Sequence, residues 1–292
     1  MKIILTGGNG FIGKSLIYKL KEHDIISIDK KIDTTFNGNQ IISDLCYNDK
    51  CIEDEIKKCD LVIHLASPVG VKNIDINADI FLEELLKINL NIFNLVKKYN
   101  KKIIFLSTSE VYLNNADAKE SDILNIGVPD KLRWGYASGK LTSEFLCKSL
   151  CKKSIIIRPF NITGVGDNKG VLYKIIESIK NEENIIVHGN GNQIRSFCDI
   201  RDFENFISLI IKNNFDGSIY NVGNENNKLS IKELSHLCTK IANSKMNILF
   251  KKYNDIYSDN FDDIQVRVPN CVKMNKIYKA KYNMENIIKS ML

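Results

Sequence analysis

A glycine-rich turn near the start of this chain limits what it can fold into more than any other feature. Residues 2–5 read as a short apolar strand, and Gly7, Gly10 and Gly13 follow at intervals of three, leading into a segment of helical periodicity. Glycine has no side chain, so the backbone can turn sharply and the strand and helix can pack closely. The chain is therefore predicted to open with the strand, turn and helix that begin a parallel α/β sheet.

Apolar runs and helical segments continue to alternate through the first half of the sequence. Further strands are predicted at 25–28, 61–65, 102–107 and 154–157, and helices at 13–22, 81–99 and 136–152. Because the strands are apolar on both faces, helices must cover the sheet on both sides. The predicted fold class is α/β, a Rossmann-like doubly wound parallel sheet.

The second half has a looser pattern, which predicts a smaller lobe. Helices are expected at 171–180, 203–212 and 231–242, and strands at 185–188 and 218–222. We expect residues 1–164, completed by about 197–223, to form the cofactor-binding domain. Residues 165–196 and 224–292 would form a smaller C-terminal α/β lobe that binds the substrate.

Charge and composition exclude several classes of protein. The chain carries 41 Lys and Arg against 35 Asp and Glu, and the basic residues are scattered, which argues against nucleic acid and suits a small anionic substrate. No run approaches the ~18 apolar residues of a membrane span. Eight cysteines include no Cys-x-x-Cys pair, so a cytoplasmic protein with reduced thiols and no metal site is expected.

The glycine turn is also a candidate dinucleotide site. Amide groups at the start of a helix attract phosphates, and the side chains that would block a diphosphate are missing here. The residues predicted to hold it are Gly7, Gly10, Phe11, Ile12 and Gly13. Asp29 ends the second strand, where a carboxylate can bind the adenosine ribose and repel the extra phosphate of NADP. NAD is therefore the predicted cofactor, although Lys30 and Lys31 follow directly.

Two residues at the start of the predicted helix 136–152 form a candidate catalytic pair. Tyr136 and Lys140 are four residues apart, so both lie on one helix face. An ammonium beside a phenol lowers the phenol pKa of ~10, which makes Tyr136 a base for a sugar hydroxyl. Thr108, Ser109 and Glu110 follow the fourth strand, at the sheet edge where such folds bind ligands.

Together these motifs resemble the extended short-chain dehydrogenase/reductases, in particular the NAD-dependent epimerase/dehydratase family. The resemblance covers nearly the whole chain. It rests on the glycine turn and on residues 44–45, 64–68, 107–112, 133–140, 158–161, 188–197 and 267–270. Members of this family modify nucleotide-sugars, so the resemblance implies a nucleotide-sugar substrate.

The resemblance also implies roles for individual residues. Asp44 and Leu45 would lie by the adenine, Ala66 would line the cofactor, and Lys140 would hold the nicotinamide ribose as well as tune Tyr136. Thr108 would bind the 4-hydroxyl of the sugar. The implied substrate-binding residues are Ser109, Asn161, Arg195 and Arg267, with the two arginines binding the diphosphate through charge-assisted hydrogen bonds.

Two positions depart from the family pattern. Gly139 stands where a serine is usual before the lysine, and Leu113 stands where a glycine is usual after Val-Tyr. Neither departure removes a catalytic group. The apolar faces of helices 81–99 and 136–152, together with the resemblance, predict a homodimer.

The reaction that follows oxidation at carbon 4 is left open by the sequence. The working hypothesis is a nucleotide-sugar epimerase. A UDP-glucuronate decarboxylase is the alternative, because the Arg-Trp before Tyr136 and Arg267 before Pro269 resemble decarboxylases. A 4,6-dehydratase is less favoured, since Glu110 could take the carbon 5 proton but Ser109 is a poor acid for the departing hydroxyl. A protein of another class, which binds NAD for regulation without turnover, is argued against by the intact set of Thr108, Tyr136 and Lys140.

Overall fold

The computed structural model describes residues 1–36, 38–68, 77–213, 217–257 and 262–292. The chain forms two compact units, each built from separate segments. The first unit comprises 1–108, 133–158 and 207–220, and the second comprises 109–132, 159–206 and 221–292. Residues 109–132, which were expected in the cofactor-binding domain, group with the second unit. The reason is that strand β6 (Asn115–Ala118) pairs there with β15 (Val266–Pro269).

The first unit is organised by a seven-stranded sheet in the order β12-β7-β5-β4-β1-β2-β3. The pairs from β7 to β3 are parallel. The strands are β1 (Lys2–Thr6), β2 (Asp24–Asp29), β3 (Asn39–Ile42), β4 (Leu61–His64), β5 (Lys102–Leu106), β7 (Lys153–Pro159) and β12 (Ile219–Val222). The chain adds strands first on one side of β1 and then on the other, which confirms the predicted doubly wound α/β fold.

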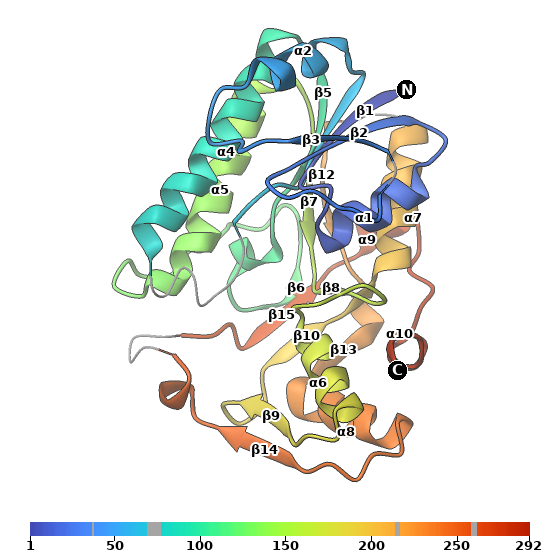
Figure 1. Cartoon of the computed structure of the whole chain (residues 1–292). Helices are drawn as coiled ribbons and strands as arrows, with labels where there is room; N and C mark the ends of the chain where they lie inside the picture. Colours follow the sequence, from blue (N-terminus) through green and yellow to red (C-terminus); the bar gives the residue numbers. More distant parts are fainter. Residues whose placement is uncertain (37, 69–76, 214–216, 258–261) are drawn as a thin grey trace. The chain divides into compact units, whose positions relative to one another are not determined.

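Helices cover both faces of this sheet. They are α1 (Phe11–Lys19), α2 (Lys50–Lys58), α4 (Ala78–Lys98), α5 (Gly135–Leu150) and the second half of α7 (Ile200–Lys212). Figure 1 shows α4 and α5 side by side on one face and α1 on the other. Helix α4 buries Leu85, Ile88, Ile92 and Val96, a spacing of three or four that places them on one face toward the sheet.

The second unit holds the smaller sheets. A four-stranded sheet has the order β13-β10-β15-β6, and two-stranded sheets join β11 to β8 and β14 to β9. Their remaining strands are β8 (Ile162–Thr163), β9 (Ile185–His188), β10 (Ile194–Ser196), β11 (Cys198–Asp199), β13 (Lys228–Ser230) and β14 (Ile248–Lys251). Helices α6 (Val171–Lys180), α8 (Ile231–Ile241) and α10 (Met284–Met291) share one apolar core; a four-residue helix, α9 (Val272–Asn275), precedes α10.

Every strand and helix expected from the sequence is present, with ends within three residues of the predicted ones. The sequence analysis missed α2 and β3, as well as most short strands of the second unit. Helix α2 buries only Ile52 and Ile56 among charged residues, and β3 has no buried residue, so neither has a strong apolar pattern. None of the helices in the described ranges is long and apolar enough to span a membrane.

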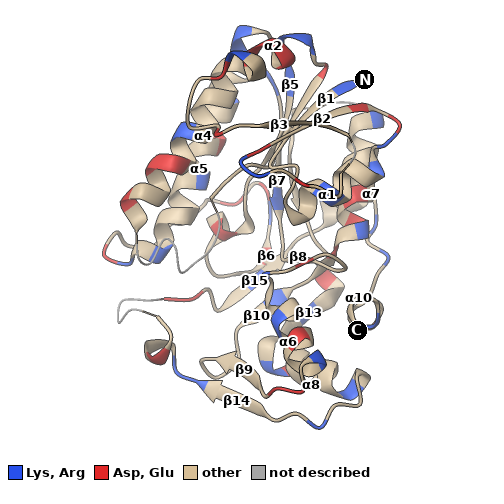
Figure 2. Cartoon of the chain, viewed as in Figure 1, with Lys and Arg blue, Asp and Glu red and all other residues tan. Residues whose placement is uncertain are grey.

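Charged residues of both signs are mixed on the helices. Figure 2 shows Lys and Arg beside Asp and Glu along α2 and α4, where Lys50 lies 3.3 Å from Asp54 and Lys87 lies 2.6 Å from Glu83. The eight cysteines, all in described segments, are free thiols.

Candidate active site

The glycine turn of the first unit has the geometry of a cradle for a diphosphate. Gly7 has a φ of +71°, and a Cβ at this position would lie 2.8 Å from the backbone nitrogen of Ala66. A Cβ on Gly13 would lie 2.5 Å from the carbonyl oxygens of Gly7 and Gly8. Helix α1 starts at Phe11, so its first-turn amides are available to phosphate oxygens. The predicted residues therefore fit the diphosphate of NAD.

Asp29 lies at the end of β2, beside this turn. Its carboxylate accepts hydrogen bonds from the backbone amides of Asn9 at 3.1 Å and Lys31 at 3.3 Å, which hold it in place. The ammonium of Lys30 lies 2.5 Å from Glu84 and 3.3 Å from Asp44. The hydrogen bond to Glu84 is the main cause of the raised pKa of Lys30. Because two carboxylates already hold Lys30, it is poorly placed to attract the extra phosphate of NADP.

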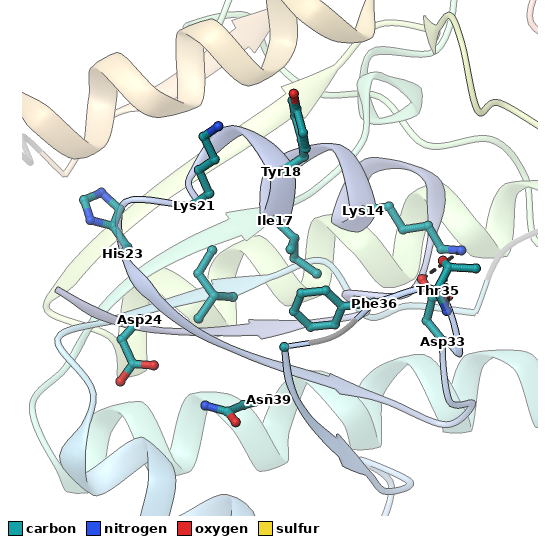
Figure 3. Close-up of a pocket in the computed structure, with 12 residues that line it drawn as sticks. Lys14, Ile17, Tyr18, Lys21, His23, Asp24, Asp33, Thr35, Phe36 and Asn39 are labelled. Atoms are coloured by element: carbon teal, nitrogen blue, oxygen red, sulfur yellow. Dashed lines mark hydrogen bonds and ion pairs between the residues drawn. The ribbon is translucent and has the colours of Figure 1, made fainter.

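A separate pocket of the first unit involves none of the predicted site residues. It has a volume of about 530 Å³ and lies between the later part of α1 and the loop before β3, with Ile17, Ile25 and Phe36 among its lining residues. Figure 3 shows Lys14 at its edge, where the ammonium pairs with Asp33 at 2.9 Å. No predicted cofactor or catalytic residue lines it.

The first unit also holds the candidate catalytic pair and Thr108. Tyr136 lies in the first turn of α5, and its ring packs edge-on against Phe81 with centroids 6.0 Å apart. Lys140, one turn later, is 2% exposed, and its ammonium donates to the carbonyl oxygen of Leu106 at 2.9 Å. Thr108 follows two residues after Leu106, at the carboxyl end of β5. Helix α5 and strand β5 thus bring Lys140 and Thr108 to the carboxyl edge of the sheet, where the sequence predicts the site.

Burial changes the acid–base behaviour of Lys140. Loss of hydration lowers the pKa of Lys140 to about 7, and the negative charge of Glu144 partly opposes this change. The ammonium also lies 5.1 Å from the ring centroid of Phe105. A buried cation of this kind interacts strongly with a phenolate formed nearby, because little water screens the two charges.

Sequence reasoning missed the buried ion pair beneath these residues. Arg158 donates to both carboxylate oxygens of Glu144, at 3.0 and 2.6 Å, and the Ser107 hydroxyl donates to the same carboxylate at 2.5 Å. The network ties the end of β5 to α5 and β7. The signal for this pair in the sequence was weak: Glu144 lies one helical turn after Lys140, and Arg158 directly follows the predicted strand 154–157, in the Arg-Pro motif.

The second unit brings together the four remaining predicted substrate residues. Arg195 on β10 and Arg267 on β15 are partners in a parallel pair, so both side chains lie on the same sheet face. Arg267 donates to Glu110 at 3.1 Å and to the side-chain oxygen of Asn161, and Arg195 lies 3.1 Å from Asp263. Burial and the charge of Arg267 lower the pKa of Arg195 to about 10.

Two candidate substrate residues of the second unit carry buried polar atoms that the described residues do not satisfy. The Ser109 hydroxyl and the Nε of Arg267 are buried and have no hydrogen-bond partner among the described residues. Buried polar groups normally have partners, so two such atoms on candidate substrate residues fit a site that a polar ligand completes. Asn161 has a φ of +35° and donates to the Ser196 carbonyl at 2.8 Å; such strain is typical of functional positions.

The two departures from the family pattern have clear local geometry. Leu113 adopts a φ of +54°, the left-handed conformation that a glycine takes without strain. A Cβ on Gly139 would lie 3.1 and 3.2 Å from methyl groups of Leu82 and Leu85 on α4, so the glycine lets α4 and α5 pack closely. Neither position changes a catalytic group.

Comparison with known proteins supports the resemblance. The chain is 29% identical, over 97% of its length and 93% of the relative, to a UDP-N-acetyl-α-D-glucosaminuronate decarboxylase of Bacillus cytotoxicus. It is 33% identical to the bifunctional polymyxin resistance protein ArnA of Wigglesworthia glossinidia brevipalpis, over 92% of this chain but only 47% of that protein.

Solved structures share the fold. The UDP-glucuronic acid 4-epimerase of Bacillus cereus, determined with UDP-glucuronic acid and NAD, has a TM-score of 0.87 and 22% identity, covering 100% of this chain and 98% of the epimerase. The sequence profile described as the NAD dependent epimerase/dehydratase family matches residues 3–223. This match confirms both the predicted family and its cofactor, NAD. The chain therefore belongs to the NAD-dependent epimerase/dehydratase family.

Proposed function

We propose that this enzyme oxidises a nucleotide-linked uronic acid at carbon 4 and then releases the carboxyl group as carbon dioxide. The observation that carries the proposal is the contact of Arg267 with Glu110 in the second unit, together with two buried donors that lack a partner there, the Nε of Arg267 and the hydroxyl of Ser109. The decarboxylase of Bacillus cytotoxicus, aligned over nearly the whole chain, supports it. A nucleotide-sugar substrate also suits the buried arginine pair, since guanidinium groups bind phosphates through paired hydrogen bonds.

The first step would use the groups of the first unit. NAD, when bound, accepts the hydride from carbon 4. Tyr136, as the phenolate, would take the proton of the 4-hydroxyl, and Thr108 would hold that oxygen by a hydrogen bond. Lys140 would stabilise the phenolate with its buried charge. The products of this step are a 4-ketone on the sugar and a neutral tyrosine.

The ketone makes the second step easy. In a uronic acid the carboxylate is then two carbons from a carbonyl, so the bond between carbons 5 and 6 can break and its electron pair passes into an enolate at carbon 4. A proton added at carbon 5 gives a 4-keto pentose. Return of the hydride from NADH to carbon 4, with the Tyr136 proton going to the oxygen, would then give the UDP-pentose and restore NAD and the phenolate. Glu110, which accepts from Arg267 at 3.1 Å, would hold that guanidinium in place beside the substrate. The hydroxyl of Ser109 would donate to the sugar, and the Nε of Arg267 would donate to the diphosphate.

Epimerisation at carbon 4, the hypothesis favoured by the sequence analysis, is the second candidate. Arg195 and Arg267 place two cations on one sheet face, and cations that held the uronate carboxylate would slow its loss. The ketone would then rotate and be reduced on its other face. The structural likeness to a UDP-glucuronic acid 4-epimerase supports this alternative.

Product analysis distinguishes the two reactions. Purified protein and NAD would be incubated with UDP-glucuronate and UDP-N-acetylglucosaminuronate labelled with ¹³C at carbon 6, and with UDP-glucose. Labelled carbon dioxide and a UDP-pentose support decarboxylation. An isomer of unchanged mass supports the epimerase, whereas loss of water contradicts both candidates. The Tyr136→Phe variant is the control for enzyme-dependent product.

We also propose a homodimer formed through α4 and α5. Ile80 on α4 and Phe145 on α5 are 61% and 71% exposed, and exposed apolar side chains on a packed helix pair suit association with a second copy. Light scattering measures the mass in solution. Replacement of Phe145 with Glu should shift the protein toward the monomer, and a wild-type protein that is monomeric at all concentrations would contradict the dimer.

A further inference from the structure

Four polar side chains lie in the apolar interior of the first unit. Thr6, His64, Asn89 and Ser143 each have 0% of their surface exposed, and they come from β1, β4, α4 and α5. Burying four polar groups costs free energy unless each finds partners. Their arrangement therefore needs a reason beyond packing.

The four side chains form one continuous chain of hydrogen bonds, which we call the Thr6–Ser143 relay. The Thr6 hydroxyl lies 2.6 Å from Nδ1 of His64, and Nε2 of His64 lies 2.9 Å from Oδ1 of Asn89. The Asn89 amide donates to the Ser143 hydroxyl at 2.7 Å, and that hydroxyl donates to the Gly139 carbonyl at 2.8 Å. The relay crosses four separate elements without a gap.

The direction of each bond follows from its neighbours. Asn89 donates through its amide nitrogen, so its oxygen must accept and Nε2 of His64 must carry the hydrogen. The ring is neutral, because burial first and the charge of Lys140 second lower the pKa of His64 to about 3. Nδ1 therefore accepts from Thr6, whose oxygen in turn accepts the Ala66 amide at 3.4 Å. Only one pattern satisfies all the groups.

The ends of the relay lie at two functional features. Thr6 directly precedes Gly7, and the backbone of Ala66 packs on Gly7 so closely that a Cβ would lie 2.8 Å away. At the other end, Gly139 directly precedes Lys140 and lies one turn after Tyr136. The charged and titratable groups that interact with Lys140 include His64 from β4 and Glu144 from its own helix. The relay thus runs from the cofactor turn to the candidate catalytic helix.

We infer that the Thr6–Ser143 relay is a positioning device, which holds the start of α5 at one register relative to the glycine turn. Apolar surfaces alone allow a helix to shift along a sheet, because their attraction has no direction. A fully satisfied hydrogen-bond network accepts only one alignment. The inference rests on the proposed function only in assigning the carbon 4 chemistry to Tyr136 and Lys140, a step that both candidate reactions share.

Substitutions at Thr6 separate this role from packing. Thr6→Val keeps the shape of the side chain and removes the hydroxyl, whereas Thr6→Ser keeps the hydroxyl and removes a methyl group. We expect kcat to fall roughly 10- to 100-fold in Thr6→Val, the range for a misplaced catalytic group, with KM for the nucleotide-sugar within about twofold. Thr6→Ser should stay close to wild type. A purely packing role predicts the reverse order and would overturn the inference.

A second pair of variants tests the far end of the relay. Ser143→Ala breaks the link to α5, and Ser235→Ala is a matched control. Ser235 is also fully buried, and its hydroxyl donates to the carbonyl four residues earlier, Ile231, at 2.8 Å, but it lies on α8 in the second unit. Ser143→Ala should lower kcat as Thr6→Val does, and the double variant should be little worse than either single one. Independent, multiplying losses would contradict a connected relay.

Hydrogen exchange of the unliganded protein gives a readout that needs neither substrate nor cofactor. In Thr6→Val, amides at the start of α5 should exchange faster than in wild type, although Thr6 lies on β1; Thr6→Ser and Ser235→Ala should leave them unchanged. If Thr6→Val exchanges faster but the wild-type protein converts no nucleotide-sugar, the result supports the relay and rejects the proposed function. Unchanged exchange and unchanged kcat in Thr6→Val would reject the relay.

Discussion

Replacement of Lys140 with Met should stabilise the folded protein while it abolishes catalysis. The pKa of Lys140 is about 7 in the folded chain, against the usual 10.5. At about 1.4 kcal/mol per pKa unit, burying the ammonium costs on the order of 5 kcal/mol below pH 7. Methionine has a similar shape and carries no charge, so the variant avoids this cost. It also loses the hydrogen bond to Leu106, and this loss cancels about 1 to 2 kcal/mol of the gain in stability.

The advantage of Lys140→Met depends on pH in a defined way. Between pH 7 and 10.5 the unfolded wild-type chain keeps the proton on Lys140 while the folded chain releases it, so the stability of the wild type rises with pH. The variant should therefore be more stable than wild type by roughly 3 kcal/mol at pH 6.5, and about as stable as wild type at pH 9.5.

Urea unfolding of both proteins at the two pH values measures this difference. Lys57→Met, at an exposed position on α2, is the control and should change the free energy of unfolding by less than about 0.5 kcal/mol. A variant that is less stable than wild type at pH 6.5, or an advantage that does not change with pH, would refute the account of a desolvated ammonium.

Three further substitutions test the site. Tyr136→Phe should keep the fold and bind NAD normally but lose kcat by roughly 10²-fold or more, since only the proton acceptor is removed; product formation at the wild-type rate would exclude Tyr136 as the base. Gly13→Ala should weaken NAD at least about tenfold by calorimetry, because its Cβ would lie 2.5 Å from two backbone oxygens; unchanged affinity would argue against the cradle. Arg267→Lys, which keeps the charge but not the fork that contacts Glu110 and Asn161, should raise KM for the nucleotide-sugar roughly tenfold; an unchanged KM would place the substrate elsewhere.

The sequence by itself determined the features that depend on neighbours along the chain. The spacing of Gly7, Gly10 and Gly13 is a local requirement of a strand-to-helix turn, and Tyr136 and Lys140 share a helix face because they are four residues apart. The alternation of apolar runs required a covered parallel sheet. Each of these follows from backbone geometry and burial, which act over a few residues.

Only the tertiary structure decided which distant groups meet. Arg267 pairs with Glu110 across 157 positions, and Arg195 lies beside Arg267 because β10 and β15 pair in that register. Lys30, which weakened the sequence argument for NAD over NADP, is held by Glu84 and Asp44. The Thr6–Ser143 relay likewise joins two strands and two helices. Such contacts depend on strand order and helix placement, which many distant residues set together, so the spacing of a few residues along the chain does not reveal them.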